Sequence, residues 1–440
     1  MQSTRSPYGS EPVYVVDGAR TPFLKARGKP GPFSASDLAI AAGRPMLARQ
    51  KFDPTELDEV ILGCAMPSPD EPNIGRIVAL RLGCGDRVPG WTVMRNCASA
   101  MQALDSAARN IALGNADLVL AGGTEAMSRA PLLFNDQMVN WFAGLNRART
   151  PVQKLQQFAK LRPGFFGPVI AILKGLTDPI VGLNMGQTCE VISHRFGIDR
   201  EHMDRFSVRS HRRLAAAFES GLMDEVVAIF EPSGKVHEED DGLRKDSDEA
   251  KLATLKPFFD RKVGLVTPGN SSQVTDGAAL LVLASARAVE KHDLPVMGRI
   301  VDCQWAALDP AQMGLGPVHA STPILQRQGL GLDDVDYWEI NEAFAGQVLS
   351  CLAAWEDAEY CSKELGLDGP LGTLDQDRLN IDGGAIATGH PVGASGARIV
   401  LHALKVLQRT GGRQAIATLC IGGGQGGAML VTREGEHGDE

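Results

Sequence analysis

The chain has 440 residues, of which 44% are hydrophobic and 22% are charged, and its net charge is −9 at pH 7. This length exceeds what one hydrophobic core normally supports, so we expect two or three well-packed domains. The negative charge argues against nucleic acid as a partner, because a nucleic-acid-binding protein needs a basic face to neutralise phosphates. A small molecule is the expected partner.

The N-terminal residues 1–11 contain no apolar stretch of signal-peptide length, and residues 14–16 already predict the first buried strand. The longest apolar run, 165–173, is far shorter than the roughly 20 residues that cross a bilayer. The cysteines are scattered and form no Cys-x-x-Cys pair, so no metal site is expected. This pattern suits a reducing cytoplasm, which is the expected location.

Two stretches of the chain share one layout. The first runs from Cys97 through a helix of small residues to an apolar strand that begins at Leu118. The second repeats this order from Gly393 through a helix to a strand over 415–422. Helices that alternate with apolar strands predict two duplicated α/β domains, with largely parallel sheets covered on both faces. Ligands of such folds bind beyond the carboxyl ends of the strands.

The two copies are separated by a segment rich in basic, methionine and aromatic residues. Within it, the apolar residues of 201–224 recur at helical spacing, which predicts a surface helix closed by Gly221. The predicted domains are an N-terminal domain over 1–130 and 256–290, an inserted loop domain over 131–255, and a C-terminal domain over 291–440.

Cys97 follows a predicted strand and begins a helix. The unpaired amides and the dipole at a helix start favour a thiolate over a thiol, so Cys97 is a candidate nucleophile. Position alone is weak support, because most buried cysteines are structural.

His390 ends the glycine-rich sequence Gly-Gly-Ala-Ile-Ala-Thr-Gly-His, which begins at Gly383. Glycines let a substrate approach closely, and Pro391 fixes the backbone after the histidine, as expected where a general base is presented to a substrate. The alternative is a hydrogen-bonded histidine in a structural turn.

Two further motifs carry polar groups at the ends of strands. Cys420 precedes Ile-Gly-Gly-Gly-Gln-Gly, whose glycines leave backbone amides free, and a second thiol there could shuttle protons. The sequence Glu-Ile-Asn-Glu-Ala-Phe-Ala over 339–345 places Asn341 and Phe344 between a strand and a helix, and alone it would be a weak signal.

Together these four motifs resemble those of the thiolase family, and the resemblance extends from Asp17 to Val431. Other matching stretches are Gly-Gly-Thr-Glu-Ala-Met-Ser over 122–128, Met-Gly-Gln-Thr from Met185, Gly-Asn-Ser-Ser-Gln-Val-Thr-Asp-Gly-Ala over 269–278, and Gly-Leu-Gly-Pro from Gly314. The resemblance implies the thiolase fold: two duplicated α/β domains with five-stranded mixed sheets plus an inserted loop domain. It also implies a homodimer or homotetramer.

The resemblance implies a division of roles as well. Cys97 would attack the keto carbon of a 3-ketoacyl-CoA, and His390 would activate its thiol. Cys420 would protonate the departing acetyl-CoA enolate and then deprotonate the incoming coenzyme A. Oxyanions would be held beside His390 by a water on Asn341, and at the amides of Cys97 and Gly422. Coenzyme A is thus a substrate, and no tightly bound cofactor is expected.

Coenzyme A itself is expected across the loop domain. By resemblance, Ser271 lies near its pantetheine arm, Met185 lines its tunnel and Phe344 also belongs to this site. The chain departs from many short-chain biosynthetic members at Asn184, where they have histidine, so that contact is not carried over. It also departs at the nucleophile, where Cys97-Ala-Ser replaces the commoner Cys-Gly-Ser.

The stretch 136–180 is longer than in simple thiolases and resembles the insertion of the β subunit of the fatty-acid oxidation trifunctional complex, which favours degradation of longer chains. Its basic residues are Arg147, Arg149, Lys154, Lys160, Arg162 and Lys174, with aromatic residues between them. Three uses compete: docking on an enoyl-CoA hydratase/3-hydroxyacyl-CoA dehydrogenase α subunit, peripheral contact with an anionic membrane, or packing over the substrate tunnel.

Three alternative functions remain. A biosynthetic acetyl-CoA acetyltransferase would use the same residues to form acetoacetyl-CoA. A decarboxylating ketoacyl synthase uses one cysteine with two histidines, and here Asn341 and Cys420 argue against it. A non-catalytic acyl-CoA or lipid-binding module would not need Cys97, His390 and Cys420 intact.

Overall fold

The apolar segments of the sequence pair into one ten-stranded mixed sheet. Its strands are β1 (Val13–Arg20), β2 (Leu24–Lys25), β3 (Glu59–Gly63), β4 (Gly90–Val93), β5 (Leu118–Ala126), β10 (Thr275–Ala284), β11 (Gly298–Ala307), β12 (Tyr337–Ile340), β13 (Gln414–Ile421) and β14 (Gln425–Thr432). Their order is β12-β13-β14-β11-β1-β10-β5-β3-β4, and β2 pairs with β10. This computed structural model describes residues 7–9 and 11–434, so most of the N-terminal stretch without a signal pattern lies outside the described residues.

The sheet differs from expectation in two ways. We expected two separate five-stranded sheets, but β1 and β11 pair antiparallel over Val13–Val15 and join the two halves. The apolar pattern also predicted largely parallel pairing, which was wrong, whereas the mixed pairing that the resemblance implied is confirmed. Among the described strands of this sheet, only β3 with β4, β3 with β5, and β12 with β13 run parallel. The cause in the C-terminal half is the tight turn at 422–424, which makes β13 and β14 a hairpin and forces them to run antiparallel.

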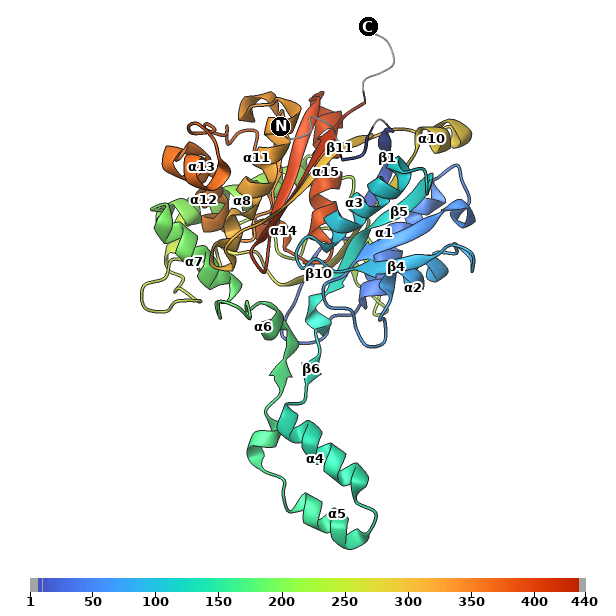
Figure 1. Ribbon diagram of the computed structural model, residues 1–440, viewed down its shortest axis with the longest axis vertical. Helices are drawn as coiled ribbons and strands as arrows, with labels where there is room; N and C mark the ends of the chain where they lie inside the picture. Colours follow the sequence, from blue (N-terminus) through green and yellow to red (C-terminus); the bar gives the residue numbers. More distant parts are fainter. Residues whose placement is uncertain (1–6, 10, 435–440) are drawn as a thin grey trace.

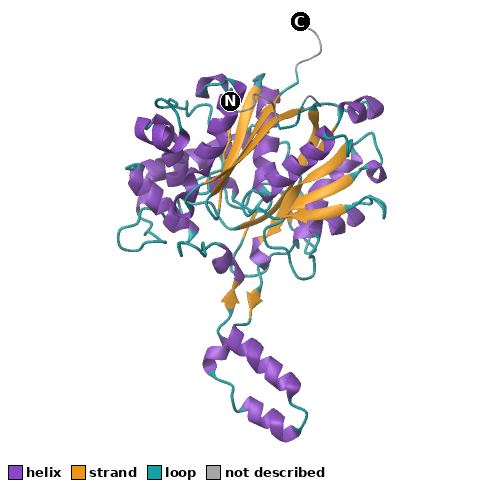
Figure 2. Cartoon of the chain, viewed as in Figure 1, coloured by secondary structure: helices purple, strands orange, loops and turns teal. Residues whose placement is uncertain are grey.

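Helices cover both faces of the sheet and fill the space between its halves (Figures 1 and 2). The helices of the body are α1 (Ala35–Ala48), α2 (Ile74–Arg81), α3 (Ser99–Ala112), α6 (Ala171–Gly175), α7 (Met185–Arg195), α8 (Arg200–Glu219), α9 (Glu249–Ala253), α10 (Ala286–His292), α11 (Gly316–Gln328), α12 (Ala345–Glu356), α13 (Ala358–Leu365), α14 (Ala385–Thr388) and α15 (Ser395–Thr410). Helices α1 and α2 pack on the N-terminal half, α11 packs on the C-terminal half, and α3 and α15 pack on each other between the two.

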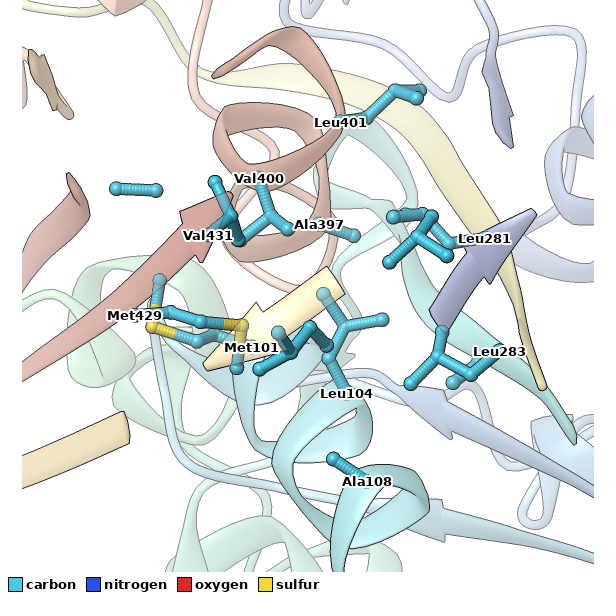
Figure 3. Close-up of a cluster of buried hydrophobic side chains, with 14 of the residues drawn as sticks. Met101, Leu104, Ala108, Leu281, Leu283, Ala397, Val400, Leu401, Met429 and Val431 are labelled. Atoms are coloured by element: carbon cyan, nitrogen blue, oxygen red, sulfur yellow. The ribbon is translucent and has the colours of Figure 1, made fainter. Parts of the chain in front are cut away.

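The central layer explains the small residues of the two repeated helices. Figure 3 shows side chains of α3 and α15, among them Met101 and Ala397, packed against residues of β10 and β14. At Gly396 an added Cβ would lie 2.6 Å from the backbone nitrogen of Met101, so only glycine lets the helices approach this closely. Each helix then ends at a glycine with positive φ, Gly114 or Gly411, before β5 or β13 begins.

The strands β5 and β10 are neighbours in the sheet, although residues 127–274 separate them in sequence. This intervening segment holds α4 to α9 and the short pair β8 (Ile229–Phe230) and β9 (Val236–His237). We predicted that 201–224 forms a surface helix, but α8 buries one face, including Met203, Phe206 and Leu214, against the C-terminal half. The prediction was based on the charged residues of this helix, but a single apolar stripe is enough for a helix to pack into a core.

Residues 132–170, here called the arm, project from the body (Figure 1). Its base is the pair β6 (Leu132–Leu133) and β7 (Val169–Ile170), and its tip holds α4 (Asp136–Arg147) and α5 (Pro151–Phe158). The tip helices therefore do not pack over the substrate tunnel, which was one of the three uses considered. Residues 172–180, after the arm, line one cavity of the body, and Leu132 and Ile170 at the base of the arm line a second.

No helix in the described part of the chain is both long enough and apolar enough to cross a membrane.

Candidate active site

Cys97 lies in the turn between β4 and α3, on the wall of a cavity of about 310 Å³. Asn96 before it adopts a left-handed conformation (φ 45°), and the Asn96 side chain donates a 2.9 Å hydrogen bond to the carbonyl of Gly422. The altered flank of the nucleophile thus connects the two loops of the site. The backbone amides of Gly422 and Cys97 both donate toward the Cys97 sulfur.

The Cys97 thiol is not a preformed thiolate. Burial raises its pKa, and the amides of Gly422 and Cys97 offset only part of this effect. We expected the helix start to favour the thiolate, and this expectation was wrong for the free protein, because removing the sulfur from water outweighs two amide dipoles. A base must therefore take the proton when a substrate binds.

His390 is buried at the end of its glycine-rich turn. Gly389 has φ 103°, and an added Cβ there would lie 2.4 Å from the side chain of Thr275, so the turn requires glycine. The Nδ1 atom of His390 lies 2.6 Å from the hydroxyl oxygen of Ser395, and Ser395 donates to the carbonyl of Pro391 at 3.0 Å. Because the Ser395 hydroxyl donates its proton to the Pro391 carbonyl, it can only accept from His390. We therefore assign the imidazole proton to Nδ1, which leaves the Nε2 lone pair free to act as a base.

The imidazole is also held neutral. Burial, together with the positive charge of Arg398, lowers the pKa of His390 to about 3. Its Nε2 atom is buried and has no protein hydrogen-bond partner. A buried, unpaired acceptor of this kind is costly unless a ligand uses it, which fits a base that waits for a thiol proton.

Asn341 follows β12 and lies beside the histidine, with its Nδ2 atom 3.4 Å from His390 Nδ1. Arg398 donates to the Asn341 side-chain oxygen at 3.3 Å and also pairs with the buried carboxylate of Glu339. Because Arg398 occupies the side-chain oxygen of Asn341, the Asn341 amide nitrogen is the group that can donate a hydrogen bond to a small ligand. Arg398 fixes the orientation of Asn341 from α15.

Cys420 lies at the carboxyl end of β13, just before the turn of Gly422. Its thiol packs among apolar side chains, including Phe344 and Met313. Burial raises the pKa of Cys420 well above its usual value, and the neighbouring thiol of Cys97 raises it further. Cys420 is therefore a protonated thiol close to Cys97, which can act as an acid first.

The three residues assigned to coenzyme A lie together. Met185, the first residue of α7, lines the cavity of Cys97 and packs against the cluster that contains Phe344 and Cys420. Ser271 pairs through its backbone with Phe344, and its hydroxyl donates to the carbonyl of Thr267 at 2.7 Å. Asn184, the departure noted above, caps α7 by accepting from the amide of Gln187.

Several residues of the site were not identified from the sequence. Ser395 and Arg398 were read only as parts of a helix, and the role of Glu125, which binds two amides of the cavity wall, was not considered. A serine one turn after His-Pro is a usable signal for Ser395, because a helix start brings positions five residues apart together. In the described part of the chain, no three His, Cys, Asp or Glu side chains come together as metal ligands.

This geometry suits acyl transfer to a thiol. Cys97 is a thiol with two amide donors, His390 carries a neutral imidazole, and Cys420 is a second protonated thiol. Acyl transfer through a covalent intermediate takes place in two steps, and it requires a nucleophile, hydrogen-bond donors for the oxyanion, and groups that accept and donate protons.

Comparisons with known proteins agree with the fold. The family models described as "Thiolase, N-terminal domain" and "Thiolase, C-terminal domain" match residues 13–287 and 294–433. The 3-ketoacyl-CoA thiolase of Serratia proteamaculans is 35% identical over 96% of this chain and 97% of its own length.

Solved structures are similar over almost the whole chain. Human mitochondrial 3-ketoacyl-CoA thiolase in complex with CoA has a TM-score of 0.82 and 33% identity, covering 98% of this chain and 100% of the human chain. The acetyl-CoA acetyltransferase of Bacillus anthracis has a TM-score of 0.82 and 34% identity, and the match covers 96% of this chain and 99% of the Bacillus anthracis chain. With both halves of the fold matched by the family models, this chain belongs to the thiolase family.

Proposed function

We propose that this thiolase is a 3-ketoacyl-CoA thiolase, which uses coenzyme A to cleave 3-ketoacyl-CoA into acetyl-CoA and an acyl-CoA shortened by two carbons. The observation that carries the proposal is the surroundings of Cys97 on the cavity wall: the amide of Gly422 is aimed at its sulfur, and the Cys420 thiol lies close to it. His390 lies two residues before Val392, which lines the same cavity. Relatives named 3-ketoacyl-CoA thiolase support it.

In the first half-reaction, Cys97 attacks the keto carbon while His390 Nε2 takes the thiol proton. The bond between C2 and C3 breaks, and its electron pair leaves with the acetyl-CoA enolate. Cys420 gives this enolate a proton, and the acyl group remains on Cys97 as a thioester. The site requires an acid here, and burial keeps Cys420 protonated.

In the second half-reaction, the Cys420 thiolate takes the proton of an incoming coenzyme A. The coenzyme A sulfur attacks the acyl carbon, Cys97 leaves, and His390 returns its proton. Oxyanions form twice, and we propose that the amides of Cys97 and Gly422 hold one, while His390 and a water on Asn341 hold the other. We place coenzyme A beside Met185, Ser271 and Phe344.

The room around Cys97 favours acyl chains longer than an acetyl group. The cavity of about 310 Å³ shares three lining residues, Met66, Met127 and Ile172, with a second cavity of about 690 Å³. An acyl tail on Cys97 that is too long for the first cavity would extend past these three residues into the second cavity. This supports degradation over the rival acetyl-CoA acetyltransferase activity, which needs no such space.

The test is thiolysis of acetoacetyl-CoA and of 3-ketohexadecanoyl-CoA, followed as loss of enolate absorbance on adding coenzyme A. We expect turnover of both, and loss of both in Cys97→Ala. Ile172→Trp, at the junction of the cavities, should lose the long substrate selectively, whereas the exposed neighbour Leu173→Trp should not.

Each other outcome is informative. Activity confined to acetoacetyl-CoA would favour the biosynthetic acetyltransferase. Binding of acyl-CoA without turnover would favour a non-catalytic acyl-CoA or lipid-binding module. An Ile172→Trp variant with an unchanged chain-length profile would contradict the proposed tail path.

For partners, we propose a homodimer or homotetramer in the cytoplasm, with the arm as a further contact. The arm carries exposed apolar side chains such as Phe142, Leu155 and Phe158 among its basic residues. This composition fits an anionic membrane surface or an enoyl-CoA hydratase/3-hydroxyacyl-CoA dehydrogenase α subunit. The net charge of −9 leaves nucleic acid out of the proposal.

A further inference from the structure

Glu125 is a fully buried carboxylate at the carboxyl end of β5 that the reaction above does not use. Its oxygens accept the backbone amides of Ala65 at 2.7 Å and Met66 at 3.1 Å, and the thiol of Cys64 lies 3.4 Å away. The amide of Gly393 also donates to it. One carboxylate thus joins three chain segments that are distant in sequence.

These segments form the walls around the nucleophile. Ala65 and Met66 line the cavity of Cys97 on one side, and Val392, just before Gly393, lines it on another. Gly393 is three residues after His390, and an added Cβ at Gly393 would lie 2.6 Å from a carboxylate oxygen of Glu125. The glycine there is explained by this close approach of the carboxylate.

Burial is the main cause of the raised pKa of Cys97, and the carboxylate of Glu125 adds to it. Burial raises the pKa of Glu125 itself to about 7, against the opposing effect of the amides it binds. The other titratable groups near these two are Cys64 and, acting on Cys64, Glu71, while Cys420 faces Cys97 from β13.

We propose that Glu125 is a positioning residue of this thiolase: its carboxylate oxygens hold the Ala65–Met66 wall and the turn of His390 against Cys97. The proposal rests on the thiolase function proposed above. It depends on two features of the side chain, its reach and its two accepting oxygens.

Two substitutions test these features. Glu125→Asp keeps the charge but withdraws the carboxylate by one methylene, so the walls should shift and kcat for acetoacetyl-CoA thiolysis should fall about 10- to 100-fold. Glu125→Gln keeps the length but replaces one accepting oxygen by an amide nitrogen that cannot accept, so kcat should fall as well, while iodoacetamide should still alkylate Cys97. KM for coenzyme A should change little in either variant, because Met185, Ser271 and Phe344 are not bound by Glu125.

Asp276→Asn is the matched control. Asp276 is buried on the neighbouring strand β10 and accepts the amide of Ser128 at 2.7 Å, so it is a comparable carboxylate that binds neither Ala65 and Met66 nor Gly393. It should keep both the wild-type kcat and the wild-type alkylation profile.

The proposal is overturned if Glu125→Asp or Glu125→Gln keeps the wild-type kcat, or if Asp276→Asn loses as much activity as Glu125→Asp. Alkylation of Cys97 does not depend on turnover. An inactive wild-type protein would therefore contradict the thiolase function alone, whereas an active wild type with unaffected Glu125 variants would contradict only the role of Glu125.

Discussion

The proton of Cys97 can move to His390 only if the Nε2 atom of the imidazole is free to accept it. The structure arranges this indirectly, since the Ser395 hydroxyl accepts a hydrogen bond from Nδ1–H and donates one to the carbonyl of Pro391. Arg398 and burial keep the ring neutral by lowering its pKa to about 3. Activity should therefore not fall where an ordinary histidine becomes protonated, near pH 6.5.

Ser395→Ala removes the acceptor that fixes the His390 tautomer. We expect kcat of thiolysis to fall about 10- to 100-fold, a part of what a positioned base contributes, with KM for coenzyme A nearly unchanged. Steady-state kinetics would measure both. Ser207→Ala is the control, because this buried hydroxyl donates only to the carbonyl of Met203 within α8. Equal losses in the two variants would contradict a specific role for Ser395.

At this scale the sequence indicated candidate reacting groups but not their supports. His390 and Cys420 lie in glycine-rich motifs, and Cys97 begins a helix directly after a strand, so these residues could be singled out. Glu125 and Arg398 act through contacts with residues far away in sequence, and a single sequence carries no sign of such contacts. The direction of the pKa shift of Cys97 was unpredictable for the same reason. Segments distant in sequence bury the thiol, and this burial raises its pKa by more than the amides at the start of the helix lower it.

Among the elements, α15 is attached to the loop domain by a buried charge cluster. His402 on α15 lies 2.9 Å from the carboxylate of Glu225 and 3.1 Å from that of Asp382, and Arg20 pairs with Glu225 from β1. Burial lowers the pKa of His402, but the two carboxylates raise it by more, so the imidazole is cationic. The cluster fixes the helix that presents Ser395 and Arg398.

Replacing this cation should change how stability depends on pH. A histidine with a raised pKa stabilises the folded state fully below its ordinary pKa, and this stabilisation is lost as pH rises above it. His402→Gln should lower the free energy of unfolding by about 3 kcal/mol near pH 6, and the difference from wild type should shrink by about pH 9. Urea unfolding at several pH values would measure this difference. A difference that is independent of pH would contradict a cationic His402.

The arm is an element that the catalytic body does not need. Its tip is attached through β6 and β7, so residues 134–168 can be replaced by Asn-Gly as a two-residue hairpin turn. We expect the shortened protein to keep its melting temperature and its thiolysis of acetoacetyl-CoA. Sedimentation with vesicles should show that the intact protein binds anionic lipid and the shortened one does not. Loss of activity on removing the arm would instead assign it to the substrate site.

Helices and strands were largely predictable as elements, because apolar periodicity reports burial directly. The repeat of helix, glycine and strand indicated the duplication, and α3 with β5 and α15 with β13 follow it. The direction of the strands was not predictable, because pairing of β11 with β1 and of β10 with β5 joins segments more than a hundred residues apart. The burial of α8 depended on the same long-range packing.

The large sheet has an edge strand, β4, that has no strand partner on its outer side among the described residues. Strand β4 is the last of the sheet and pairs only with β3 among the described strands. Exposed edges of this kind invite pairing with another chain unless charge or a covering element protects them. Here the edge carries Trp91, and Met94 beside it is 64% exposed, so it is apolar rather than protected. We therefore expect β4 to lie at the subunit interface of the proposed homo-oligomer.

Met94→Glu tests this expectation, because a charge cannot be buried against a second apolar edge without a partner. The wild type should sediment as a dimer or tetramer, and Met94→Glu should shift toward the monomer as the protein is diluted. Leu113→Glu, at the far end of α3 and 73% exposed, is the matched control and should keep the wild-type assembly. If Met94→Glu assembles like the wild type, the interface lies elsewhere. Because Met94 is three residues from Cys97, an interface at β4 would also place the second subunit next to the nucleophile, so dissociation should lower thiolysis in step with the loss of dimer.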